Sequence, residues 1–305
     1  MNDLKISKKF DSKDPVYQVS GLTDSYLNNK IIDLINEFRI ESYIKDDFGK
    51  YHLNNEQSNK IIENSYLKKI TSKLLSPVFL EYIGNLLYNS NSSIIEYLDY
   101  LNIFSEKNKK SFLDKLSKSK YKLIPLNSDR DKTELELKDP QSLWVNNFTQ
   151  IAFDKDKIEE LMLAVGSIVF YPKIQISLIR KNGYIPIHVD REDKILSLMI
   201  YLPKNEEQMR SRLGTTFYKP KGEKQLIMKM GYGHTLLPPK SMDNFQKELY
   251  RPIKTDFNGE NAIFFFRSNS SWHSFEYDDL DIGERLSINI NFFFPLVKKL
   301  SQKKN

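Results

Sequence analysis

Residues 184–203, YIPIHVDREDKILSLMIYLP, decide the fold. Two short apolar segments, IPIHV and ILSLMIYL, flank a charged turn, and this pattern is typical of two strands joined by a turn. Similar runs rich in Ile, Phe, Tyr and Val, separated by Gly, Pro and Asn, occur from about residue 170 to residue 294. Strands at this density favour an antiparallel sandwich or barrel. We therefore expect a β-rich core over residues 161–297.

Residues 1–160 show another pattern, with apolar positions at helical spacing. Thr23 and Asp24 precede the stretch YLNNKIIDLINEF, whose apolar residues recur behind a capping residue. Further stripes of this kind lie in NKIIENSYLKKITSKLL, PVFLEYIGNLLYN and SSIIEYLDYLNIF. We expect an α+β chain with a mostly helical N-terminal region packed on a mainly β core, and a basic C-terminal tail over residues 298–305.

His188 and Asp190 are the first candidates for a functional site. They lie in YIPIHVD, a segment with strand character. Because side chains alternate across a strand, residues i and i+2 point to the same face. One imidazole and one carboxylate therefore converge, as a metal site requires.

The amino-acid composition limits the other ligands of such a site. The chain has 4 histidines and no cysteine, which excludes disulfides, Cys-ligated zinc fingers, iron–sulfur clusters and thiol nucleophiles. A second imidazole has to come from His52, His234 or His273. His273 is the best candidate because it follows the apolar strand NAIFFFR, and we expect His52 and His234 to be structural. Two histidines and one carboxylate on one face of a metal leave adjacent positions open for other ligands.

The last strand, GERLSININFFF at 283–294, places polar residues on one face. Alternation puts Arg285, Ser287 and Asn289 together, with Leu286 and the following isoleucines on the opposite face. Such a polar face looks either into water or into a polar cavity. A guanidinium in a cavity is a bidentate receptor for a carboxylate, and Ser287 can add a hydroxyl.

Charge and hydropathy exclude several other classes of function. The net charge is +6, but the lysines alternate with aspartates and glutamates, so we do not expect nucleic-acid binding. No stretch approaches the roughly 18 apolar residues of a membrane span, and the N-terminus has no signal-peptide core. We expect a cytoplasmic protein that does not bind a membrane.

Together these motifs resemble the Fe(II)- and 2-oxoglutarate-dependent oxygenase superfamily, in particular its prolyl 4-hydroxylase-like branch. The ordered pattern is HVD at 188–190, IYLP at 200–203, GTTFY at 214–218, the distal histidine of NAIFFFRSNSSWH at 261–273, and GERLSI at 283–288. The resemblance covers about residues 170–294 and implies a double-stranded β-helix, or jelly-roll, fold.

The resemblance also implies a metal site and a reaction. His188, Asp190 and His273 would bind Fe(II), and 2-oxoglutarate and O2 would be the cosubstrates. The family reaction converts 2-oxoglutarate to succinate and CO2 while a substrate is oxidised. Halogenases of this type have a small residue at the carboxylate position, so Asp190 favours hydroxylation.

The cosubstrate residues follow from the same resemblance. Arg285 would bind the distal carboxylate of 2-oxoglutarate, with Ser287 beside it. Tyr201 matches a position where a tyrosine hydroxyl helps to hold that carboxylate in oxygen-sensing prolyl hydroxylases. Tyr201 shares a strand face with Ser197 by alternation, which agrees with this role.

The function stays open between three alternatives. A small-molecule or carrier-tethered substrate is slightly favoured over a peptidyl one, because two features of the prolyl branch are altered. No tyrosine stands at Ile185 or Pro186, and the usual Gly-Gly pair is Gly214-Thr215. A non-catalytic module that senses 2-oxoglutarate is the third alternative. The oligomeric state is open as well.

Overall fold

A computed structural model describes most of the chain. It covers residues 4–10, 14–38, 43–46, 48–53, 55–74, 76–89, 104–118, 123–125, 152–153, 159–160, 162–163, 168–191, 194–211, 213–223, 235–236, 245–277, 283–293 and 296–297. His234, the tail at 298–305 and most of the apolar stripe at 92–104 lie outside the described residues.

The larger of the two main sheets has nine strands. Eight of them form one path, in the order β1 (Lys5–Phe10), β2 (Val16–Ser20), β13 (Asn261–Phe266), β9 (Lys194–Tyr201), β15 (Arg285–Phe293), β7 (Ile168–Ile179), β4 (Lys50–Leu53) and β3 (Tyr43–Lys45). The ninth strand, β5 (Leu123–Pro125), pairs with β7 in parallel.

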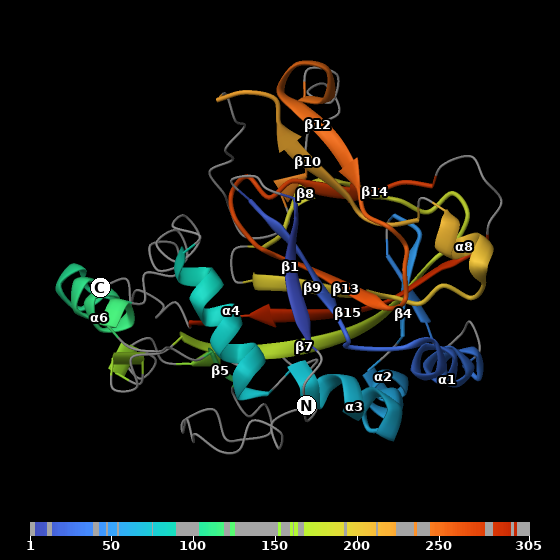
Figure 1. Ribbon diagram of the computed structural model, residues 1–305, viewed down its shortest axis with the longest axis horizontal. Coiled ribbons are helices and arrows are strands. Elements are labelled where there is room, and N and C mark those ends of the chain that lie inside the picture. The colour runs from blue at the N-terminus through green and yellow to red at the C-terminus, as the bar shows by residue number, and fades with distance from the viewer. Residues whose placement is uncertain are drawn as a thin grey trace, which may run out of the picture. The chain divides into compact units, whose positions relative to one another are not determined.

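The smaller sheet has five strands and carries both candidate metal-binding histidines. Its order is β11 (Thr235–Leu236), β8 (Ile185–Val189), β14 (His273–Phe275), β10 (Thr216–Pro220) and β12 (Tyr250–Lys254). Each pair of neighbouring strands in this sheet is antiparallel. Figure 1 shows the smaller sheet above the larger one.

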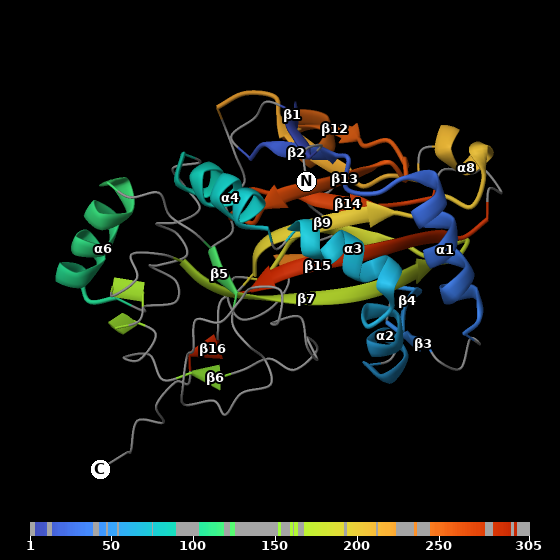
Figure 2. The same ribbon diagram turned by 60° about the horizontal axis from the view of Figure 1, so that its bottom comes forward.

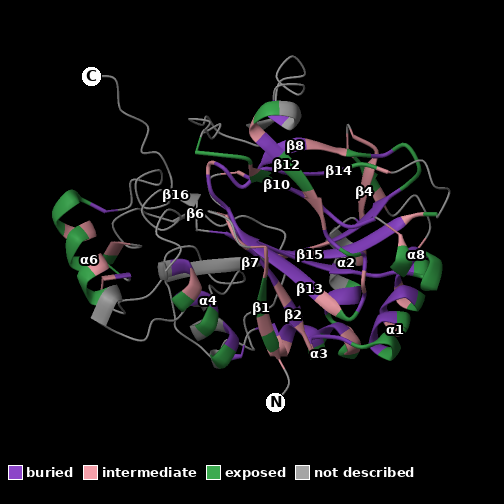
Figure 3. Cartoon of the chain, turned by 45° about the horizontal axis from the view of Figure 1, so that its top comes forward, coloured by how far each residue is buried: buried purple, intermediate pink, exposed green. Residues whose placement is uncertain are grey.

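Apolar side chains from both sheets meet between them, as the alternating sequence pattern requires. β9 is buried along its whole length, and Figure 3 shows long buried stretches in β13 and β15 as well. The shared core cluster consists of Val16, Ile179, Met199, Tyr201, Leu213, Phe217, Phe257, Ile263, Phe265 and Phe275. The expected mainly β core is therefore confirmed as a β-sandwich.

Helices cover the other face of the larger sheet. α1 (Ser25–Asn36) begins where the Asp24 carboxylate accepts a hydrogen bond from the Leu27 amide at 2.7 Å. Ile35 of α1 lines a small cavity together with Leu178 and Leu286, which are on the outer face of β7 and β15. α2 (Asn55–Ile62) and α3 (Ser65–Leu74) follow on the same side, below the larger sheet in Figure 1 and in front of it in Figure 2.

Two further short helices are described in the loops of the smaller sheet. α8 (Glu206–Arg210) begins at Asn205, whose side chain accepts a hydrogen bond from the Gln208 amide at 2.9 Å. The second is a π-helical turn, Phe245–Leu249, which leads into β12.

The chain forms two compact units. One consists of residues 1–73 and 174–291 and contains both faces of the candidate site. The other consists of residues 74–173 and 292–305; its described elements include α4 (Pro77–Asn89), α6 (Glu106–Lys118), β5, β6 (Ala152–Phe153) and β16 (Leu296–Val297). In this second unit α4 contacts β5, and β16 pairs with β6 in parallel.

The structure differs from the expected division at residue 160. Helices are present in the N-terminal region, but so are β1, β2, β3 and β4, which all belong to the larger sheet. β2 pairs with β13, more than 200 residues later in the chain, and β4 pairs with β7. Local periodicity cannot reveal such partners, because they are determined by tertiary packing.

None of the described helices is long and apolar enough to cross a membrane.

Candidate metal centre and anion site

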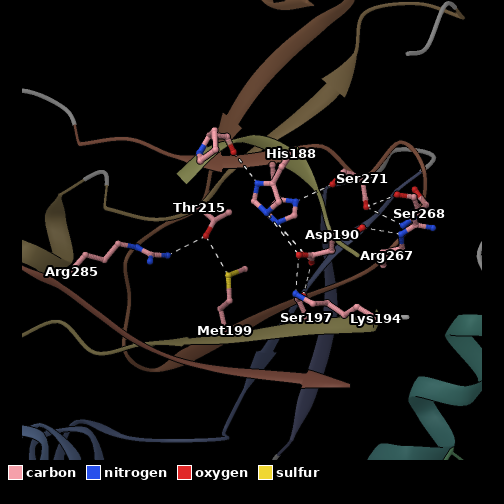
Figure 4. A network of polar contacts seen from close by, with 12 residues as sticks. His188, Asp190, Lys194, Ser197, Met199, Thr215, Arg267, Ser268, Ser271 and Arg285 are labelled. Carbon is pink, nitrogen blue, oxygen red and sulfur yellow. Dashed lines mark hydrogen bonds and ion pairs between the residues drawn. The ribbon is translucent and has the colours of Figure 1, made fainter. Parts of the chain in front are cut away.

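His188, Asp190 and His273 lie together between the two sheets. His188 is on β8 and His273 on β14, and the two residues are directly paired in the antiparallel register. Their Nε2 atoms each lie 3.8 Å from a different oxygen of Asp190, which follows β8 directly. All three potential ligand atoms are within 4.8 Å of one another and all three residues are buried (Figure 4). This is the grouping that alternation in HVD and the position of His273 predicted.

Backbone carbonyls determine which imidazole nitrogen faces the carboxylate. His188 Nδ1 lies 2.8 Å from the Pro186 carbonyl, and His273 Nδ1 lies 3.0 Å from the Ser271 carbonyl. Because a carbonyl only accepts, each Nδ1 carries the proton and donates it. The lone pair of each Nε2 is therefore directed at the shared space beside Asp190, as in metal-binding histidines.

Burial keeps both imidazoles neutral. It lowers the pKa of His188, and it lowers the pKa of His273 to about 3, with the neighbouring His188 as a second cause. The side chains of Phe265 and Phe217 lie against the His273 ring, with centroids 4.7 and 6.1 Å away. Neutral imidazole is the form that binds a metal.

Two side chains hold the Asp190 carboxylate. Lys194 Nζ donates to Oδ1 at 2.8 Å, and the Ser197 hydroxyl donates to Oδ2 at 2.8 Å. Arg267 Nε donates to the Asp190 backbone carbonyl at 3.2 Å. Each carboxylate oxygen is thus oriented while it keeps lone pairs for a metal.

Lys194 is a functional residue that sequence reasoning missed. It belongs to the charged turn between the segments IPIHV and ILSLMIYL, but it is only 8% exposed and forms a buried ion pair with Asp190. Its position four residues after the predicted ligand is a weak signal, because nothing local shows that the turn folds back onto Asp190.

Arg285 forms the other end of the site. Its side chain is 2% exposed; Nε donates to the Leu213 carbonyl at 2.9 Å and Nη2 to the Thr215 hydroxyl at 3.2 Å. The guanidinium carbon lies 4.4 Å from the centroid of the Phe275 ring. Figure 4 shows Thr215 and Met199 between Arg285 and the metal-site residues.

Within the part of the chain that the structure describes, no carboxylate pairs with Arg285. Burial lowers the pKa of its guanidinium, since the charged form has lost water. A buried cation without an acidic partner is costly unless an anion binds it. The site therefore fits an anionic ligand.

Ser287 gives a second, independent sign of a ligand. It lies on the same face of β15 as Arg285 and is fully buried, and its hydroxyl has no hydrogen-bond partner among the described residues. Buried hydroxyls are nearly always hydrogen-bonded, so this one calls for an explanation. A carboxylate at Arg285 is an acceptor that the hydroxyl can use.

Tyr201 lies close to Arg285 but contacts neighbouring residues through its hydroxyl. That hydroxyl accepts from the Thr215 amide at 3.0 Å and lies 2.9 and 3.0 Å from the hydroxyls of Thr215 and Thr255. Tyr201 thus holds Thr215, which in turn holds Arg285. Gly214 permits this approach, because a Cβ there would lie 1.8 Å from the Thr255 carbonyl oxygen.

His52 and two further residues do not take part in the metal site. His52 is on β4, with Nδ1 3.1 Å from the Ser177 hydroxyl, and does not join the metal ligands. Trp272 packs in a separate aromatic cluster next to Phe245. Arg180 pairs with Glu284 at 2.9 Å near the surface.

Comparison with known proteins finds similarity among solved structures only. No protein-family model matches the chain, and no curated protein is significantly similar in sequence. Among solved structures, the chain resembles the epimerase SnoN in complex with Fe3+, alpha-ketoglutarate and nogalamycin RO, at 9% identity over 92% of this chain and 79% of that chain, with a TM-score of 0.44.

Two further similar structures come from a virus and a bacterium. The collagen prolyl hydroxylase of Paramecium Bursaria Chlorella virus-1, in its 2OG complex, is 10% identical over 91% of this chain and 94% of that chain, with a TM-score of 0.36. A 2OG-Fe(II) oxygenase family oxidoreductase of Burkholderia pseudomallei is 14% identical over 52% of this chain and 61% of that chain, with a TM-score of 0.27. Similarity this distant supplies none of the functional argument, which rests on the side chains described above.

Proposed function

We propose that this protein is an Fe(II)- and 2-oxoglutarate-dependent dioxygenase that hydroxylates its substrate. The observation that carries the proposal is the pair of buried sites between the two sheets: two neutral imidazoles and a carboxylate at one, and a guanidinium without an acidic partner among the described residues at the other. We further propose that the β-sandwich is a double-stranded β-helix, as the sequence resemblance implies.

The residues present suit both groups. The Nε2 atoms of His188 and His273 and an oxygen of Asp190 would hold Fe(II), since two histidines and one carboxylate are the ligand set of non-haem iron oxygenases. Arg285 and Ser287 would hold the distal carboxylate of 2-oxoglutarate. When bound, iron and 2-oxoglutarate together supply the O2-dependent oxidation, with release of succinate and CO2.

The protein's own residues orient these groups and exclude water. Lys194 and Ser197 keep the Asp190 carboxylate in one orientation, and the carbonyls of Pro186 and Ser271 keep both imidazoles in one tautomer. Aromatic rings line the space around His273. A dry, preorganised site of this kind strengthens the electrostatic interactions within it.

The direct test is conversion of 2-oxoglutarate to succinate by purified protein with Fe(II) and O2. Wild-type protein is expected to form succinate even without its substrate, by uncoupled turnover. His188→Ala and Asp190→Ala should abolish this activity, because each removes one of three ligands, and the matched control His52→Ala should retain it. A wild-type protein that binds iron and forms no succinate would contradict the enzyme and favour the sensor.

The class of substrate is proposed from the sequence. We favour a small-molecule or carrier-tethered substrate over a peptidyl one, because the chain lacks the tyrosine at Ile185 or Pro186 and the Gly-Gly pair of the prolyl branch. Succinate release stimulated by candidate small molecules, measured against proline-containing peptides, would decide between these classes.

A further inference from the structure

A lysine from the N-terminal region lies on the same face of the larger sheet as Arg285. Lys50 begins β4 and is paired with Ile179 of β7, just as His52 is paired with Ser177. Paired residues of antiparallel strands point to the same face of a sheet. Ile179 belongs to the core cluster between the two sheets, so Lys50 also projects towards the inner face.

Lys50 is aligned with Arg285 across three neighbouring strands. The Tyr277 hydroxyl donates to the Ile179 carbonyl and accepts from the Arg285 amide at 2.9 Å, so these two residues face each other across β7 and β15. Lys50 lies on the other side of Ile179, roughly 10 Å from β15 at the usual strand spacing. A lysine side chain on this face can extend over Ile179 towards the guanidinium.

The electrostatics agree with this placement. Burial is the main cause that lowers the pKa of Lys50 to about 8; the positive charges of Arg285 and Lys194 contribute to this shift, and Asp46 and Asp190 oppose it. The Lys50 amine therefore interacts electrostatically both with Arg285 and with the Asp190–Lys194 pair beside the metal ligands. Among the described residues no carboxylate forms an ion pair with Lys50, whereas Lys194 is neutralised by Asp190.

We propose that Lys50 is a second cationic contact for the distal carboxylate of 2-oxoglutarate, beside Arg285. The inference rests on the proposed function. Two cations on the inner face of the larger sheet, neither paired with an acid of the described chain, are best neutralised by a bound anion. The distal carboxylate is the anion that Arg285 already recruits, and its two oxygens can accept from both side chains.

The test is calorimetric titration of anaerobic, Fe(II)-loaded protein with 2-oxoglutarate and, separately, with 2-oxopentanoate, which lacks the distal carboxylate. Lys50→Ala is expected to weaken 2-oxoglutarate binding about tenfold and to change 2-oxopentanoate binding by less than about twofold. Lys50→Arg should restore most of the affinity. Lys45→Ala is the matched control, because Lys45 is paired with Tyr51 on the opposite face of the same hairpin and is exposed.

The possible outcomes separate this inference from the proposed function. If wild-type protein does not bind 2-oxoglutarate, the proposed function fails. If wild-type protein binds it and Lys50→Ala binds it equally well, only the role of Lys50 is overturned. Equal weakening of both 2-oxo acids would also overturn that role, because the lost contact would not be to the distal carboxylate.

Discussion

Ser287 and Ser177 are buried serines on the inner face of neighbouring strands, and they differ in their partners. The Ser177 hydroxyl is bonded to His52 and Asn289, at 3.1 and 2.9 Å, whereas the Ser287 hydroxyl has no partner among the described residues. An unsatisfied buried hydroxyl costs stability. A bound ligand that accepts a hydrogen bond from Ser287 would offset this cost.

Because of this difference, replacement of the two serines by alanine should change the free energy of unfolding in opposite directions. Ser287→Ala should raise the free energy of unfolding of the ligand-free protein by about 1 kcal/mol, while Ser177→Ala should lower it by about 1 kcal/mol. Ser287→Ala should also weaken 2-oxoglutarate binding about fivefold. Urea denaturation and calorimetry measure both effects. A Ser287→Ala variant that loses stability and keeps full affinity would mean that the hydroxyl is structural.

If Lys50 contacts the cosubstrate as proposed, binding of 2-oxoglutarate should depend on pH. The pKa of Lys50 is about 8 in the folded protein against a usual value of 10.5, so between these values the unfolded chain binds more protons and the folded state gains stability as pH rises. A bound carboxylate favours the protonated amine, so 2-oxoglutarate affinity should be greatest below about pH 8 and fall above it. The dissociation constant measured from about pH 7 to pH 9.5 should rise in wild-type protein and change much less in Lys50→Met. The same rise in both proteins would assign the effect to another group.

At the scale of single elements, the start of β10 determines where Thr215 and Arg285 meet. Gly214 passes so close to Thr255 that a Cβ would lie 1.8 Å from its carbonyl oxygen, while a Cβ at Gly222 would meet nothing within 4 Å. Gly214→Ala should therefore destabilise the fold by about 3 kcal/mol and weaken 2-oxoglutarate binding, because the strand must shift. Gly222→Ala should stay within about 0.5 kcal/mol of wild type. Thermal denaturation of both variants checks this, and equal melting temperatures would contradict the close approach.

Alternation along a single strand reveals which face of the strand a residue occupies. Alternation in HVD and in GERLSI placed His188, Asp190, Arg285 and Ser287 on inward faces, because the side-chain period of a strand is a local property. Lys194 and Lys50 were missed because their roles depend on how a turn folds back and on which distant strand β4 pairs with. Neither fact is encoded in nearby residues.

For the whole molecule, the two main sheets could be anticipated as a β-rich core, but the contribution of the first 53 residues could not. Four strands from this part complete the larger sheet, and β2 covers the edge of β13. An N-terminal region that we expected to be mostly helical and packed on the core therefore contributes strands to it. Only long-range strand pairing, which short sequence windows do not contain, carries this information.

A chain that begins at residue 161 is thus expected not to fold. Without β2, the edge of β13 is exposed, and a long apolar edge strand promotes aggregation. Size-exclusion chromatography and circular dichroism, compared with the full chain, measure the result. A monomeric, cooperatively folded fragment would contradict the role of the N-terminal strands.

The central claim is that the site between the two sheets holds iron at His188, Asp190 and His273 and 2-oxoglutarate at Arg285. Its most direct test is an anaerobic optical titration of the protein with Fe(II) and 2-oxoglutarate, because the charge-transfer absorption appears only when the 2-oxo acid binds the iron. Wild-type protein should develop this band with both components, His188→Ala should lose it, and Arg285→Met should retain iron but require at least about a hundredfold more 2-oxoglutarate. Absence of the band in wild-type protein that has bound iron would contradict the claim.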